Sequence, residues 1–205
     1  MMGSLYDEAT RSYYAQRAAE YDDWWLGTGL FAQRDRPGWN EEVATLVAMV
    51  SRIPPVEVLD VACGTGFLTR HLRGEVVALD QSTEMLAIAA ERLHPPSRVV
   101  CGEALPLPFL DGQFDLLFTS HLYGHLQAGE REQFLAEARR VAADLLIVES
   151  ALRNDVAPEG WEERTLNDGS RHRIYKRHFR AEELAQELGG GTVLFHGRWF
   201  VVVAA

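Results

Sequence analysis

The fold is decided by residues 58–69, Val-Leu-Asp-Val-Ala-Cys-Gly-Thr-Gly-Phe-Leu-Thr. The apolar run 56–62 predicts a strand, and the two closely spaced glycines predict a tight turn that opens a helix over about 67–73. A second apolar run ends in Asp80, sixteen residues beyond Gly64. A glycine turn lets a ligand approach the backbone, and an acid at the next strand tip can bind a ribose diol. The pattern therefore predicts a site for a nucleoside-bearing ligand.

The acid inside the motif indicates which nucleoside. In the dinucleotide pattern G-x-G-x-x-G, the third glycine position is occupied here by Thr69, which weakens that interpretation. Asp60 lies beside the turn, where an anion repels a pyrophosphate but suits an ammonium or sulfonium charge. A nicotinamide oxidoreductase remains an alternative.

Several further segments carry a resemblance to a known family. Asp60–Gly66 has the form of the first motif of class I S-adenosylmethionine-dependent methyltransferases, and Asp80–Leu86 resembles their ribose segment. Cys101–Ala104 resembles the adenine segment, and the stretches 106–109 and 113–118 match the approach to the fourth strand. The resemblance implies a Rossmann-like sheet of seven mostly parallel strands in the order 3-2-1-4-5-7-6, with the last strand antiparallel and helices on both faces.

The periodicity independently predicts an α/β domain. Strands at 56–62, 75–80, 97–101, 115–120 and 144–150 alternate with helices at 67–73, 83–94 and 130–143. We expect a single domain over 1–205. Its parts are an N-terminal helical lid (1–52, with helices at 5–25 and 41–52), a cofactor-binding core (53–152), a hairpin insertion (153–180, strands 161–165 and 171–179), and a terminal helix with two strands (181–205, helix 181–188, strands 192–196 and 199–204).

The resemblance assigns cofactor roles to a set of residues. Gly64 and Gly66 would lie against the methionine and ribose, Asp60 near the methionine amino group, and Asp80 on the ribose diol. Glu103 stands where the family usually has Asp and would bind the adenine amino group. The expected contacts are Tyr13, Arg17, Asp60, Ala62, Gly64, Gly66, Asp80, Gln81, Met85, Glu103, Ala104 and Ser120. Each has an ordinary structural alternative, such as helix packing for Tyr13 and Arg17, which share a face of the lid.

Methyl transfer from a sulfonium is a direct displacement that needs a base only when the acceptor is protonated. His121 is the best-placed base after the fourth strand, and Tyr123 is a second catalytic candidate. His125 suits a structural role better. We expect no metal site, because no convincing ligand spacing occurs.

The one basic island is 171–180, in the hairpin. Alternation places Arg171, Arg173, Tyr175 and Arg177 on one strand face and His172, Ile174, Lys176 and His178 on the other. The island is either an exposed hairpin balanced by nearby glutamates or a wall for an acceptor carboxylate or phosphate, with Arg173 and Arg177 as the binding residues.

The composition of the chain limits the classes of molecule that could be the methyl acceptor. The net charge of −10 disfavours a nucleic-acid partner, and the absence of a long apolar run or signal pattern predicts a cytoplasmic protein without membrane contact. We expect transfer from S-adenosyl-L-methionine, with S-adenosyl-L-homocysteine as product, to an O or N atom of a small-molecule acceptor, by a monomer or homodimer. Alternatives are a protein or nucleic-acid acceptor, or a cofactor-binding regulatory protein without turnover.

Overall fold

The computed structural model of the protein describes residues 8–205, so the first part of the predicted lid lies outside the described residues. The central sheet has the strand order β3-β2-β1-β4-β5-β9-β8. Its strands are β1 (Val56–Val61), β2 (Gly74–Asp80), β3 (Arg98–Cys101), β4 (Phe114–Ser120), β5 (Ala142–Ser150), β8 (Thr192–His196) and β9 (Phe200–Ala204). The first five run parallel, and β9 pairs antiparallel with β5. The predicted sheet and its order are confirmed.

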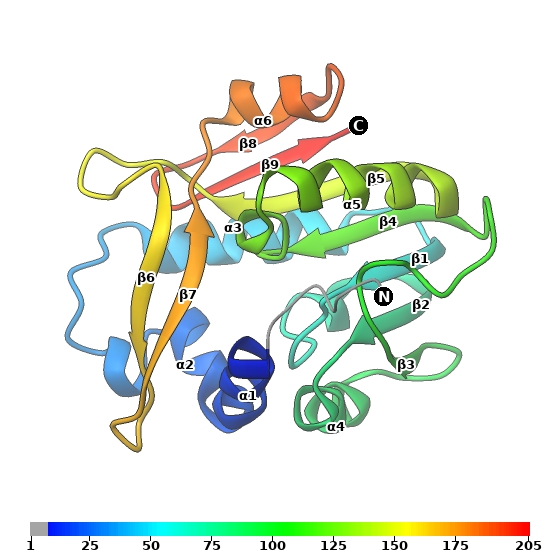
Figure 1. Cartoon of the computed structure of the whole chain (residues 1–205). Coiled ribbons are helices and arrows are strands. Elements are labelled where there is room, and N and C mark those ends of the chain that lie inside the picture. Colours follow the sequence, from blue (N-terminus) through cyan, green and yellow to red (C-terminus); the bar gives the residue numbers. More distant parts are fainter. Residues whose placement is uncertain (1–7) are drawn as a thin grey trace.

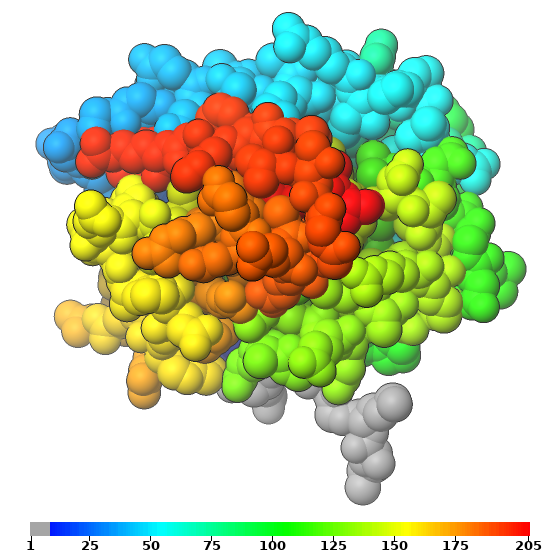
Figure 2. Space-filling model, turned by 90° about the horizontal axis from the view of Figure 1, so that it is seen from above, coloured from blue at the N-terminus to red at the C-terminus, as the bar shows by residue number. Residues whose placement is uncertain are grey.

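Helices cover both faces of this sheet (Figure 1). The helix α5 (Ala128–Val141) and the shorter α6 (Ala181–Glu187) pack on one face, where Phe134 and Leu184 belong to one core cluster. The helix α3 (Trp39–Ser51) packs on the other face through Leu46, and α4 (Thr83–Arg92) flanks β2 and β3. Seen from above, the C-terminal elements lie between α3 and α5 (Figure 2). Full burial of such a leucine contributes about 1.5–3 kcal/mol, so both faces hold the sheet.

The expected helix over 67–73 is wrong. Only one 3-10 turn, η3 (Thr69–His71), forms there, and Leu72 is already extended. The cause is the short connection: residues 62–73 must make the glycine turn, cross the sheet face and re-enter it at β2. No room remains for a full α-helix.

The lid consists of α1 (Glu8–Arg17), η1 (Ala18–Glu20) and α2 (Tyr21–Leu26), followed by η2 (Gly29–Phe31). Asp22 holds it on the core, because its carboxylate pairs with Arg92 at 2.6 Å and accepts a hydrogen bond from Thr65 at 2.5 Å. Trp25 stacks on Phe67 with ring centroids 4.8 Å apart. The lid therefore covers the glycine turn directly.

The predicted hairpin forms a separate two-stranded sheet of β6 (Glu159–Thr165) and β7 (Arg171–Arg177), which stands beside the main sheet and alongside the lid (Figure 1). A last 3-10 turn, η4 (Tyr123–His125), follows β4 and contacts β7. Across residues 8–205, no helix combines the length and the apolar character that crossing a bilayer requires.

Candidate functional site

A first cavity, about 580 Å³ when its open mouth is included, lies at the carboxyl ends of β1, β2 and β4. Its lining residues are Tyr14, Tyr21, Ala62, Gly64, Leu79, Asp80, Gln81, Met85, Gly102, Glu103, Ala104, Ser120, His121, Leu122 and His125. Eight of the predicted cofactor contacts are therefore gathered in one place, namely Ala62, Gly64, Asp80, Gln81, Met85, Glu103, Ala104 and Ser120. This edge of a parallel sheet is where ligands ordinarily bind.

The two glycines of the turn serve different purposes. Both have positive φ, 55° at Gly64 and 74° at Gly66, and Ala62 before them is also left-handed at 59°. A Cβ on Gly64 would lie 3.4 Å from the ring of Tyr21, on the cavity side, whereas one on Gly66 would lie 3.3 Å from Cβ of Ala89 in α4. Gly64 thus keeps backbone accessible to a ligand, and Gly66 permits close packing against α4.

Asp80 ties the turn to the tip of β2. Its Oδ2 accepts a hydrogen bond from Gly64 N at 2.9 Å, and its Oδ1 accepts one from Ser82 N at 2.9 Å. The carboxylate is 8% exposed, and burial raises its pKa above the ordinary value. Each oxygen retains acceptor capacity for a ligand hydroxyl pair.

Asp60 lies deeper, beside a smaller adjoining cavity that it shares with Ala62 and Ser120. Its Oδ2 accepts a hydrogen bond from Thr69 at 2.6 Å, while its Oδ1 is buried and has no partner within residues 8–205. Burial raises the pKa of this carboxyl to about 7. An acceptor oxygen held in this way suits a donor supplied by a ligand.

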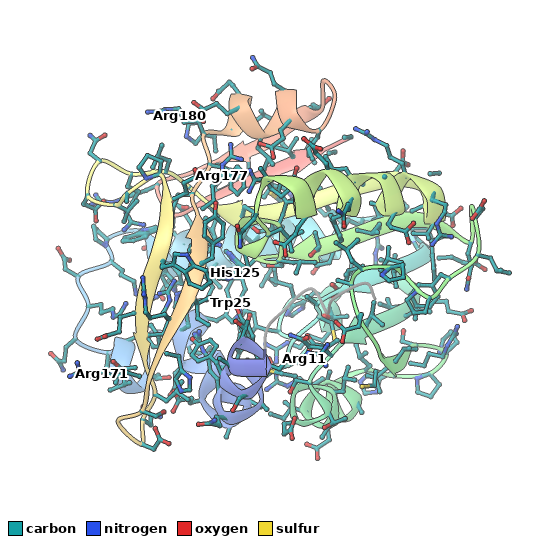
Figure 3. All side chains as sticks on the ribbon, in the orientation of Figure 1. Arg11, Trp25, His125, Arg171, Arg177 and Arg180 are labelled. Carbon is teal, nitrogen blue, oxygen red and sulfur yellow. The ribbon has the colours of Figure 1, made fainter. Side chains whose placement is uncertain are left out.

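Three other buried polar atoms in the first cavity also lack partners among the described residues: Gln81 Oε1, Glu103 Oε2 and Ser120 Oγ. The other oxygen of Glu103 pairs with Arg11, which projects from α1 (Figure 3). Buried unpaired acceptors are costly, and a ligand with amino and hydroxyl groups would satisfy them. These unpartnered acceptors therefore fit a nucleoside ligand that carries amino and hydroxyl donors.

His121 follows β4 in a left-handed conformation, with φ of 62°. Its Nδ1 lies 3.3 Å from Ser150 Oγ and 3.8 Å from the Glu149 carboxylate, and Trp24 stands edge-on to the ring at 4.9 Å. Burial, and then the nearby charge of Lys176, hold its pKa well below the ordinary value. The imidazole is therefore neutral near pH 7, and a proton on Nδ1 would leave Nε2 as an acceptor.

A second cavity of about 470 Å³ adjoins the first beneath the hairpin and the lid. Its lining residues are Tyr13, Tyr14, Arg17, Tyr21, Trp24, His121, His125, Ser150, Arg164, Ile174 and Lys176. The walls shared with the first cavity are Tyr14, Tyr21, His121 and His125. Figure 3 shows His125 between β7 and the main sheet. Two compartments thus meet at His121.

Some predicted site residues lie elsewhere than expected. Tyr13 and Arg17 line the second cavity and not the first, so their assignment to the cofactor remains a prediction. Tyr123 is fully buried in the core, lines neither of these cavities, and donates its hydroxyl to Glu187 at 3.0 Å. Burial and that glutamate raise its pKa above the ordinary value, so it is a poor base there.

The hairpin faces alternate as predicted, but the cavity lies on the other face from the proposed wall. Arg173 is exposed and Arg177 pairs with Glu187 at 3.0 Å, whereas Ile174 and Lys176 point inward and are buried. The signal for orientation was Ile174, the only aliphatic residue in β7, because an apolar side chain marks the covered face of a strand.

Lys176 is the only lysine in the sequence and is 3% exposed. Its Nζ donates to Glu149 Oε2 at 2.8 Å, and Glu149 itself is fully buried at the end of β5. The other oxygen of Glu149 accepts from Gly124 N at 2.7 Å. A Cβ on Gly124 would lie 2.9 Å from that ammonium and 2.7 Å from Arg177 O, so the hairpin docks closely on η4.

Comparisons with known proteins agree with this geometry. A family model described as a methyltransferase domain matches residues 58–144. The chain is 36% identical over 146 residues to the 2-phytyl-1,4-naphtoquinone methyltransferase of Synechocystis sp., covering 65% of this chain and 58% of the relative. It is 37% identical over 108 residues to the demethylmenaquinone methyltransferase of Thermotoga maritima, covering 50% and 44%. The chain spans about half the length of these curated relatives.

A solved structure, the DhpI-SAM-HEP complex, matches over the whole chain. The TM-score is 0.79 at 26% identity, covering 100% of this chain and 99% of that one. The match includes the lid and the hairpin insertion, which lie outside the region that the family model covers.

Within residues 8–205, no three His, Cys, Asp or Glu side chains gather as a metal site would require.

Proposed function

We propose that the chain is a class I S-adenosylmethionine-dependent methyltransferase that transfers a methyl group from that cofactor to an O or N atom of a small-molecule acceptor. The observation that carries the proposal is the pair of cavities joined at His121. The first carries unpartnered hydrogen-bond acceptors for the nucleoside, and the second is a separate adjoining cavity for the acceptor molecule. The two curated relatives reported above are named as methyltransferases of quinones.

The residues of the first cavity divide the cofactor between them. Asp80 would hold the ribose hydroxyls, Gly64 would leave room for the chain beside the sulfur, and Asp60 would receive the amino group through its unpartnered Oδ1. Gln81 and Glu103 offer unpartnered acceptors toward the adenine end. When bound, the cofactor supplies an electrophilic methyl group on a sulfonium.

The chain's own contribution is alignment and proton acceptance. The lid and the hairpin form the walls of the second cavity. Walls on both sides of an acceptor would favour its in-line approach to the methyl group. An acceptor oxygen or nitrogen that took this methyl group, with S-adenosylhomocysteine as the leaving product, would have to lose its proton. His121, neutral and adjacent to both cavities, is the proposed recipient of that proton, and this favours an O–H or N–H acceptor over carbon.

Calorimetry and a transfer assay test the proposal. We expect S-adenosylmethionine and S-adenosylhomocysteine to bind with one site and NAD to show no saturable heat. Labelled methyl groups should appear in small molecules of a metabolite panel and not in added protein or nucleic acid. Preference for NAD would overturn the cofactor assignment, and tight cofactor binding without turnover on any panel would favour a regulatory protein.

Two further expectations accompany the proposal. We predict a monomer or homodimer, which light scattering on the purified protein measures. We also predict a cytoplasmic protein, which fractionation of the source cells checks.

A further inference from the structure

The second cavity concentrates positive charge in a chain whose net charge is −10. Arg17 reaches it from α1, Arg164 from β6 and Lys176 from β7. Arg164 and Lys176 belong to the two paired strands of the hairpin, and Arg17 joins them because the lid helix α1 packs beside β7 (Figure 1). Cationic side chains brought together from three elements indicate a built site for an anion.

The carboxylates around the cavity do not balance these cations. Lys176 pairs with Glu149 at 2.8 Å, and Arg164 pairs with Glu162 at 2.6 Å. Arg17 instead contacts the Tyr13 hydroxyl and lies over the ring of Tyr21 at 5.0 Å. Among residues 8–205, no carboxylate lies within ion-pair distance of its guanidinium. One cation at the wall thus lacks an anionic partner.

Burial and then the positive charge around the second cavity lower the pKa of two neighbouring groups, Arg34 and His125. The pKa of Arg34 is lowered by partial burial and then by the charges of Arg164 and Arg17. The pKa of His125 is held well below its ordinary value by burial and then by Lys176, with Arg164 and Arg17 adding to the effect. Like charges held together cost free energy, which a bound anion would offset.

We propose that the second cavity binds the acid group of the acceptor, so that the substrate is a small molecule carrying a carboxylate or phosphate-type oxyanion. This inference rests on the proposed function, because it names the acceptor class for the same site. Arg17 and Arg164 bind the oxyanion, so in this proposal Arg17 serves the acceptor and not, as the sequence predicted, the cofactor. The buried pair of Lys176 and Glu149 keeps β7 in place above it. The reacting oxygen or nitrogen then lies toward His121, at the wall shared with the first cavity.

The test uses the full chain saturated with S-adenosylhomocysteine, so that only the second cavity is free. Inorganic phosphate and acetate are titrated at constant ionic strength, with trimethyl phosphate and methyl acetate as uncharged counterparts. Calorimetry gives the affinity, and tryptophan fluorescence reports occupancy through Trp24 in the cavity wall. We expect saturable binding of at least one oxyanion and none of its neutral counterpart.

Variants locate the binding. Arg164→Gln and Arg17→Gln should each weaken the oxyanion at least fivefold. Arg171→Gln is the matched control: it lies on the same hairpin, its side chain is 71% exposed, and it points away from the cavity (Figure 3). It should leave the affinity unchanged. If Arg17→Gln fails to fold, Arg164→Gln with an unchanged melting temperature still decides the test.

The outcomes separate the two proposals. No heat with S-adenosylhomocysteine would overturn the proposed function. Normal binding of S-adenosylhomocysteine without oxyanion binding, or equal oxyanion affinities in Arg164→Gln and Arg171→Gln, would overturn the acceptor class alone. Tighter binding of phosphate than acetate would support a phosphate-type acceptor, and the reverse would support a carboxylate.

Discussion

The two cavities that meet at His121 are built from different kinds of structure. The first is made by loops at the strand ends, with backbone N–H groups and carboxylates as its polar atoms. The second is made by the lid and the inserted hairpin, with guanidinium, ammonium and aromatic groups as its walls. The first therefore depends on local turns of the core, and the second on how two attached elements dock.

The difference teaches where specificity resides. A cofactor shared by a whole family is served by the core, whose turns are fixed by the sheet. An acceptor that varies between relatives is served by side chains on attachments, which can change without altering the sheet. Substitutions in the first cavity should therefore change cofactor affinity, and substitutions in the second should change oxyanion affinity. Each experiment below could contradict this division.

The largest effect is expected for Lys176→Met. Removal of the ammonium leaves Glu149 buried and unpaired, which should lower the free energy of unfolding by about 3–5 kcal/mol. Urea unfolding measures this. The double variant Lys176→Met with Glu149→Gln should recover most of the loss, since no buried charge remains. Equal stabilities of the wild type and Lys176→Met would show that the hairpin does not depend on the pair.

Asp80→Asn should weaken binding of S-adenosylhomocysteine at least tenfold, about 1.4 kcal/mol. The amide keeps the shape of the side chain but loses the charge that accepts from Gly64 N and Ser82 N and, as proposed, from the ribose. Calorimetry measures the affinity. The comparison of cavities predicts unchanged oxyanion affinity in this variant, and a parallel loss would show that the two compartments act as one.

Asp60 should make cofactor affinity depend on pH. Its pKa is about 7, so its carboxyl becomes protonated as the pH falls through 7 and loses its attraction for the amino group. We expect S-adenosylmethionine to bind about tenfold more weakly at pH 6 than at pH 8 through this group, because its ionised fraction falls by that factor. In Asp60→Asn that difference should disappear, apart from the ligand's own titration. The same pH profile in both proteins would contradict the assignment.

The smallest effect is expected for Arg173→Gln, on the outer face of the hairpin. This side chain is exposed, so its loss should change the free energy of unfolding by less than about 0.5 kcal/mol. The oxyanion affinity should also stay the same. A change in acceptor KM comparable to that of Arg164→Gln would restore the outer-face wall that the sequence had suggested.

The core and the first cavity could be predicted from sequence because their determinants are local. Alternation of apolar runs indicated every strand of the main sheet, and Gly64 and Asp80 lie at fixed spacing from those strands. The helix expected at 67–73 was wrong because periodicity does not report how little chain joins β1 to β2. The short connection between the two strands therefore leaves a 3-10 turn where the apolar periodicity predicted an α-helix.

The second cavity was predictable only in part, because its contacts join distant segments. The basic hairpin and the aromatic lid were both recognised, but nothing local says that β7 turns Lys176 toward Glu149, twenty-seven residues earlier. The orientation of Tyr123 was also not predictable, but here the side chain turns away from the cavities. It comes just after β4, yet its ring turns into the core against Phe134 and Phe179. The position of a residue along the chain therefore did not determine where the side chain of Lys176 or of Tyr123 points.

The lone lysine has a practical consequence for anyone who labels this protein. With Lys176 paired beneath the hairpin, the sequence offers amine-reactive reagents no exposed lysine among the residues that the structure describes. Acylation at that position would require the reagent to enter the second cavity and the ammonium to leave Glu149. The rate of Lys176 labelling therefore measures how readily a reagent gains access to the second cavity.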